Sequence, residues 1–257
     1  MSGRRNLLRG AAAAPAVVAL PVSAQPDGGT LAAWRAGRRD IPPQPPLRFL
    51  DAAEAAFVSA AVDLLIPADD QWPGAVWAGV PSYIDGQLAG AWGQGARLYK
   101  EGPWEPGVGS QGYQLPHTPQ HLYRRSLAAL RQAMPDFATA EAAAQTEMLR
   151  AIEAGRVDCG GYNSAVFFET LLANTVEGWF ADPAYGGNRD MVGWRMIGFP
   201  GAHAAWLPTY VQHGVRHEGE PHPMGDAGAH QHAASPLLRD ASAGHGHAPG
   251  PRHGGHR

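Results

Sequence analysis

Histidine is the residue type that gathers most visibly in one part of the chain. Nine of the twelve histidines lie in residues 213–257, among glycine, alanine, proline and serine. Neutral imidazole is a common ligand for zinc, copper and nickel, but an ordered metal site also needs fixed geometry and supporting hydrogen bonds. A segment of this composition cannot bury enough apolar surface to order itself. We therefore expect a disordered tail with weak, adventitious metal binding. A specific metal site is kept as the alternative, with the candidate ligands His213, His217, His230, His232, His245 and His247.

A glycine pattern of the type G-x-G-x-x-G spans residues 107–112. This pattern binds a dinucleotide only where it joins a strand to a helix. Here Pro106 disfavours a preceding central strand, and Pro116 prevents a long helix from following. No serine or cysteine nucleophile stands in a recognisable context near the histidines of the body, His117, His121 and His203. The sequence therefore predicts no catalytic and no cofactor-binding residue in this chain.

Cys159 is the single cysteine, so an internal disulfide and a zinc site with two cysteines of this chain are both excluded. It lies in a glycine-containing turn between two predicted helices. In an oxidising compartment a lone thiol in a loop could form an intersubunit disulfide. The alternative is a buried, inert thiol.

Residues 177–201 form the densest group of aromatic, charged and turn-forming residues. Gly186, Gly187 and Asn188 permit tight turns with positive φ. Tryptophan, tyrosine and arginine are enriched at the energetic centres of protein interfaces. The pattern fits a partner interface and equally a rigid loop that packs on its own domain.

The first 24 residues have the parts of an export signal, namely a basic start, a short apolar stretch and a small-residue cleavage site. The adjacent Arg4 and Arg5, followed by two leucines, resemble a twin-arginine signal. An ordinary secretory signal with two chance arginines is the alternative. The apolar stretch is too short to span a bilayer. Twin-arginine export carries folded cargo, so the chain either binds a cofactor or travels with a protein that does.

The elements that would position these residues are helical. Helices are predicted near residues 51–66, 81–92, 119–130, 139–154 and 163–179, from apolar residues at helical spacing and from capping residues. Asp51 with Glu54, Thr118 before a proline, and Asn163 are the predicted caps. No long alternating stretch of β-branched residues predicts a strand. The predicted fold is mainly α.

Four segments follow from this pattern. Residues 1–24 are the cleaved signal, 25–46 a Pro-rich linker with little structure, 47–212 one helical domain with long Pro/Gly-rich loops, and 213–257 the disordered His-rich tail. The formal net charge of −3 gives no basic field that would recruit nucleic acid.

One family resemblance is carried by the runs Asp182–Asp190, Gly193–Arg195 and Ile197–Gly201. Supporting features are the runs Pro67–Asp70 and Gly79–Pro81, the pair Ile84-Asp85, Tyr99 with Gly102-Pro103, and Gly112–Gln114. These residues resemble the gluconate 2-dehydrogenase subunit 3 family over roughly residues 47–212. The His-rich tail is not part of that pattern.

The resemblance implies a small, non-catalytic subunit of a membrane-bound, flavin-dependent sugar or sugar-acid dehydrogenase. In such complexes a large subunit of the glucose-methanol-choline type holds FAD, and a multihaem cytochrome c subunit passes electrons to quinone. The small subunit carries the export signal for the large one. The implied location is the periplasm, with the inner membrane reached through the partner subunits. The expected interface residues lie in the 93–117 and 182–201 loops: Tyr113, Asp182, Pro183, Tyr185, Gly186, Gly187, Asn188, Arg189, Asp190, Trp194 and Arg195.

Two rival hypotheses belong to other classes. A periplasmic metal-binding protein would use the His-rich tail and would lose its metal when cut near residue 212. An enzyme acting alone would turn over substrate without a partner, although the sequence offers no acid, base or nucleophile set for it. The substrate of a dehydrogenase complex stays open, because specificity would reside in the flavin subunit.

Overall fold

The computed structural model of the chain describes residues 30–37, 39–98, 101–104, 116–201 and 220–224. The chain divides into two units, Met1–Gly225 and Asp226–Arg257, and all described residues belong to the first. The signal, the G-x-G-x-x-G pattern at 107–112 and nearly all of the His-rich tail lie outside the described residues.

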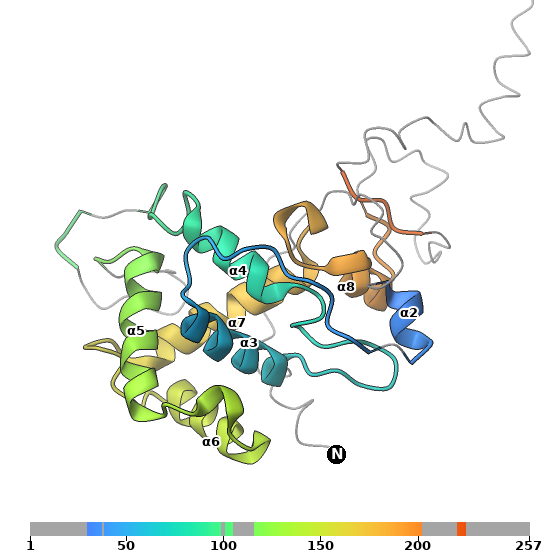
Figure 1. The fold of residues 1–257 in the computed structure, drawn as a ribbon. Helices are drawn as coiled ribbons and strands as arrows, with labels where there is room; N and C mark the ends of the chain where they lie inside the picture. Colours follow the sequence, from blue (N-terminus) through green and yellow to red (C-terminus); the bar gives the residue numbers. More distant parts are fainter. Residues whose placement is uncertain (1–29, 38, 99–100, 105–115, 202–219, 225–257) are drawn as a thin grey trace, which may run out of the picture. The chain divides into compact units, whose positions relative to one another are not determined.

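Within the described part the regular structure is helical and contains no strand, which confirms the predicted mainly α fold (Figure 1). The α-helices are α2 (Leu31–Arg35), α3 (Ala52–Leu65), α4 (Val80–Ala89), α5 (Pro119–Ala133), α6 (Ala142–Glu153), α7 (Ser164–Phe180) and α8 (Val192–Ile197). Three short 3-10 helices are η2 (Phe137–Thr139), η3 (Pro183–Tyr185) and η4 (Arg189–Met191). No helix of the described residues combines the length and apolar character that a membrane span requires.

The capping residues expected from the sequence begin the long helices. Asp51 accepts from the backbone N–H of Glu54 at 2.7 Å, and the Glu54 side chain accepts from the N–H of Asp51 at 2.9 Å, so the reciprocal capping box is present. Thr118 caps α5, and Asn163 caps α7. The predicted helix over 139–154 begins later, at Ala142, because the preceding residues form η2 instead.

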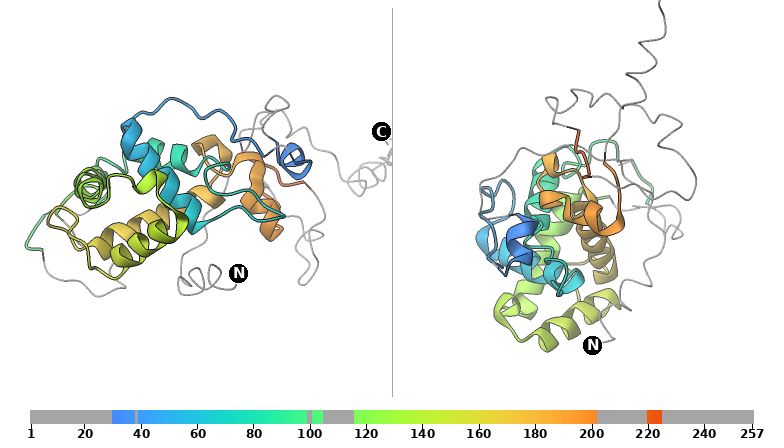
Figure 2. Two further views of the ribbon diagram at one scale, coloured as in Figure 1. Left: turned by 60° about the horizontal axis from the view of Figure 1, so that its bottom comes forward. Right: turned by 90° about the vertical axis from the view of Figure 1, so that its right-hand side faces the viewer.

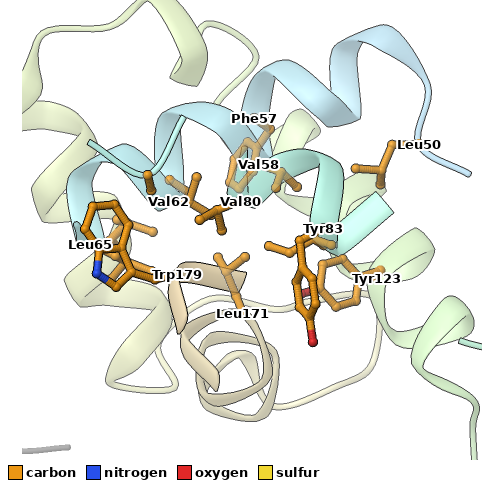
Figure 3. Close-up of a cluster of buried hydrophobic side chains, with 14 of the residues drawn as sticks. Leu50, Phe57, Val58, Val62, Leu65, Val80, Tyr83, Tyr123, Leu171 and Trp179 are labelled. Carbon is orange, nitrogen blue, oxygen red and sulfur yellow. The ribbon is translucent and has the colours of Figure 1, made fainter. Parts of the chain in front are cut away.

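Helix α7 is the centre of the domain. It packs against α3, α4, α5, α6 and α8, and Figure 2 shows it among these helices from two further directions. The core side chains of α3 and α4 meet those of α7 in Figure 3, where Trp179 lies beside Leu65 and Leu171 lies near Val80. Gly178 permits the contact with α4, since a Cβ there would lie 2.8 Å from Cδ1 of the Tyr83 ring.

The prediction of an unstructured linker over 25–46 is wrong for its middle. Residues 31–35 form α2, in which Leu31 and Trp34 are each only 3% exposed and join the main core. The proline-rich pattern hid this helix, because five residues do not make a stable helix without tertiary contacts. Residues 39–47, which hold four prolines, have no helix or strand.

Candidate functional site

Residues 182–201 follow α7 and are called the motif loop below. The loop contains η3, η4 and α8 in succession. Asn188, Asp190 and Met191 have positive φ angles of 47°, 52° and 53°, a region that non-glycine residues rarely occupy. A backbone of this shape is maintained only where surrounding contacts fix it.

Asn188 supplies such contacts from inside the loop. Its side chain is fully buried, donates to the carbonyl oxygen of Ala181 at 2.8 Å and accepts from the N–H of Gly193 at 2.8 Å. It therefore ties the end of α7 to the start of α8. The indole of Trp194, which is 1% exposed, donates to the carbonyl oxygen of Phe180 at 2.8 Å and closes the loop a second time.

Arg189 and Asp190 reach outward from the loop to other parts of the chain. The Arg189 guanidinium donates to the carbonyl oxygens of Trp77 at 3.1 Å and Pro43 at 3.3 Å. One carboxylate oxygen of Asp190 accepts from the backbone N–H of Leu31 at 2.6 Å. This contact joins residues that are 159 positions apart in the sequence. Arg189 and Asp190 thus attach the N-terminal segment to the domain.

Arg195 holds the backbone and the side chain of Asp190. Its Nε donates to the carbonyl oxygen of Asp190 at 2.8 Å, and its Nη2 lies 3.7 Å from Oδ1 of that residue. It also pairs with Glu220. The chain returns there, since the N–H of His222 donates to the carbonyl oxygen of Pro200 at 3.0 Å.

Asp182 is the buried acid of the motif loop. It is 1% exposed, and its Oδ1 accepts from the N–H of Ala184 at 2.7 Å, which caps η3. Its Oδ2 has no hydrogen-bond partner among the described residues. Burial raises the pKa of this carboxyl group to about 6, although the Ala184 hydrogen bond opposes the shift.

The structure separates the expected interface residues into an inner and an outer set. Asp182, Gly187, Asn188 and Trp194 are buried, while Pro183, Arg189, Asp190 and Arg195 are partly exposed. Gly186 and Tyr185 lie at the surface, with Tyr185 54% exposed. Tyr113 lies outside the described residues. The inner set fits the packed-loop interpretation, and only the outer set presents side chains to a partner.

Two exposed apolar side chains of the loop were not among the expected interface residues. Met196 is 41% exposed and Ile197 is 60% exposed, both at the end of α8. The sequence could not separate them from core residues, because a helix of six residues shows less than two turns of periodicity.

Cys159 is completely buried between the chain's own elements. Burial and the nearby Asp158 carboxylate raise the pKa of the thiol to about 11, although the Ser126 hydroxyl opposes the shift. This environment favours the inert-thiol interpretation. An intersubunit disulfide would require the 158–163 turn to open, so it stays a prediction.

Asp85 is a positioning residue whose structural role the sequence did not reveal. Its carboxylate accepts from the N–H groups of Arg48, Phe49 and Leu50 at 2.7, 2.9 and 2.8 Å. It fixes the entry of the chain into α3 from the neighbouring helix α4. Such a role leaves no local pattern, because the partners are more than 30 positions away.

The metal hypothesis finds no support among the residues that the structure describes, which contain no group of three His, Cys, Asp or Glu placed to hold an ion. His213, His217, His230, His232, His245 and His247 lie outside them. His117 and His121 lie near each other at the start of α5, with ring centroids 6.2 Å apart.

The comparison with protein families decides the assignment. The family model for gluconate 2-dehydrogenase subunit 3 matches residues 52–201, more than half of the chain. The chain belongs to the gluconate 2-dehydrogenase subunit 3 family. No curated protein and no solved structure gives a significant match. The family match includes Asp85 and the whole motif loop, whereas α2 precedes it. Membership makes the chain a subunit of a multi-subunit dehydrogenase.

Proposed function

We propose that the chain is the non-catalytic small subunit of a flavin-dependent sugar or sugar-acid dehydrogenase. The observation that carries this proposal is the family match over residues 52–201. FAD would reside in a large partner subunit of the glucose-methanol-choline type and haem c in a multihaem cytochrome subunit. The small subunit would supply no cofactor and no reacting group.

The role of the small subunit in this proposal is assembly and export. A protein that binds the native flavoprotein and not its unfolded form stabilises it by mass action. Arg4 and Arg5 would then direct the folded pair through the twin-arginine machinery to the periplasm. The complex would stay at the inner membrane through its partner subunits.

The contact surface is assigned to the outer side of the motif loop. Tyr185, Met196 and Ile197 are its large exposed apolar side chains. Tyrosine and methionine are enriched at interfaces, and a rigid support lowers the entropy lost on binding. Asn188 and Trp194 provide that support through their hydrogen bonds to Ala181 and Phe180.

A deletion strain tests the proposal. Without this chain, the flavoprotein should fall to low abundance and be missing from the periplasm. The native chain should restore both properties. A chain with Arg4→Lys and Arg5→Lys should restore abundance and leave the flavoprotein in the cytoplasm. A flavoprotein exported at its normal level in the deletion strain would refute the proposal.

The alternative function, metal binding by the tail, rests on the nine histidines of residues 213–257. It requires tight, stoichiometric metal that is lost on truncation near residue 212. Metal analysis of the full and truncated chains after dialysis distinguishes the two functions.

A further inference from the structure

Several side chains of the domain attach the N-terminal segment of the described chain, among them Ser82, which donates to Oε1 of Gln44 at 3.0 Å. Asp190 accepts from the N–H of Leu31 at 2.6 Å, and Arg189 donates to the carbonyl oxygen of Pro43 at 3.3 Å. Asp85 accepts from three consecutive N–H groups at residues 48–50. Asp190, Arg189 and Asp85 all lie within the family match, and the segment that they attach lies before it.

Helix α2 is the part of this segment that depends most on its attachment. Leu31 and Trp34 are each 3% exposed, and the Arg35 guanidinium lies 4.7 Å from the centre of the Trp72 ring. Thr30 caps the helix by accepting from the N–H of Ala33 at 3.1 Å. A helix of five residues is unstable alone, so α2 forms only when it is docked. Figures 1 and 2 show it beside the motif loop.

The surface that binds α2 forms only when the motif loop is folded. Asp190 has a φ of 52°, and Asn188 and Arg195 fix the backbone on both sides of it. These contacts join the end of α7, the start of α8 and the returning residue Glu220. An unfolded or partly folded loop therefore cannot present the Asp190 carboxylate to Leu31.

We propose that α2 is a clasp through which the folded state of the motif loop controls the presentation of the export signal. This inference rests on the proposed export function. The segment directly after the expected cleavage site docks only on a finished loop. A correctly folded chain then holds its signal five residues, 25–29, from a folded surface.

Release of the clasp would change the signal's surroundings in two ways. The tether would lengthen to residues 25–42, because Arg189 still holds Pro43, and its maximum reach would grow from about 18 Å to about 63 Å at about 3.5 Å per residue. It would also expose the apolar side chains of Leu31 and Trp34 beside the signal. An exposed apolar segment is a mark of an unfolded chain, so an unclasped chain should be a poor substrate for a route that carries folded cargo.

Hydrogen exchange on the full chain tests the docking step. Asp190→Ala removes the acceptor for Leu31, and Thr30→Ala removes the cap without touching the motif loop. Exchange of the amides in residues 31–36 should become about tenfold faster in both variants, with α3 and α7 unchanged. Glu147→Ala, which removes an exposed ion pair with Arg150, is the matched control. Unchanged exchange at residues 31–36 in Thr30→Ala would overturn the proposal even if Asp190→Ala unfolds.

Export of the same variants tests the coupling. The periplasmic fraction of Asp190→Ala and of Thr30→Ala should fall clearly below that of Glu147→Ala, because each variant weakens the docking of α2 by one hydrogen bond. Capture of the flavoprotein by Thr30→Ala, whose site lies outside the motif loop, should stay unchanged. If the amides of residues 31–36 exchange faster and export stays normal, the proposed coupling between α2 docking and export is wrong. Failure of the native chain to capture or export a flavoprotein would instead refute the proposed function. The exchange experiment would still test the docking of α2, because it does not involve the flavoprotein.

Discussion

Asp182 shows at the scale of one residue how the motif loop combines order with an energetic cost. One of its oxygens caps η3, while the other is buried without a hydrogen-bond partner among the described residues. The folded state therefore favours the protonated acid, and its pKa rises from the ordinary 3.8 to about 6. The stabilising contribution of this group is fully present below pH 4 and is lost as the pH rises through about 6.

Asp182→Asn should show how much free energy the burial of the ionised Asp182 carboxylate costs. The amide cannot ionise, and its oxygen can still accept from Ala184. The melting temperature of the variant relative to the native chain should rise between pH 4 and pH 7, by an amount corresponding to at most about 3 kcal/mol. Thermal unfolding at several pH values measures it, with the exposed Glu147→Gln as control. Parallel profiles for Asp182→Asn and the native chain would contradict the assignment.

Cys159 permits a second test at this scale. A thiol with a pKa of about 11 is about one-thousandth ionised at pH 8, and burial also blocks access. The native chain should react with a thiol reagent at least about 100-fold more slowly than the chain in denaturant. The native chain should co-purify with its partner equally with and without reductant, as the Cys159→Ser control must. Rapid labelling of the native chain, or a partner band that disappears with reductant, would contradict the inert-thiol interpretation and support an intersubunit disulfide.

At the scale of elements, the sequence predicted those helices whose first turns carry local capping residues. Asp51 with Glu54, Thr118 and Asn163 are local signals, and each caps a helix in the structure. Helix α2 and the short helices of the motif loop were missed, because distant residues hold them in place. The resemblance identified the loop correctly as a family feature. Which of its side chains point inward depends on α7 and could not be read from the loop itself.

The contact between α7 and α8 predicts the effect of an alanine at Gly193, and Gly86 in α4 serves as the comparison. A Cβ at Gly193 would lie 2.3 Å from the carbonyl oxygen of Trp179, so Gly193→Ala should lower the free energy of unfolding by about 3 kcal/mol. Gly86, within α4, has no atom within 4 Å of such a Cβ. Gly86→Ala should raise the free energy of unfolding by about 0.5–1 kcal/mol. Urea unfolding compares the two, and equal effects would show that α8 does not pack as described.

At the scale of the whole molecule, the motif loop has two sides with different tasks. The buried side chains of Asn188 and Trp194 close the loop on α7, and the partly exposed Arg189 and Asp190 attach the N-terminal segment. The outer residues of the loop, Tyr185, Met196 and Ile197, offer an apolar surface that this chain does not cover within its described part. Under the proposed function the small subunit acts through this surface, so assembly is the property to measure.

The most direct measurement is capture of a flavoprotein by the chain tagged just after residue 24. The native chain should co-elute from periplasm and solubilised membranes with a larger protein that shows flavin absorbance. Ile197→Asp should weaken that capture about tenfold or more, as expected for a central interface residue. Ile41→Asp, at a site of similar exposure outside the loop, should leave it unchanged. A colourless chain that elutes alone would contradict the assembly function, and equal capture by both variants would move the interface away from the motif loop.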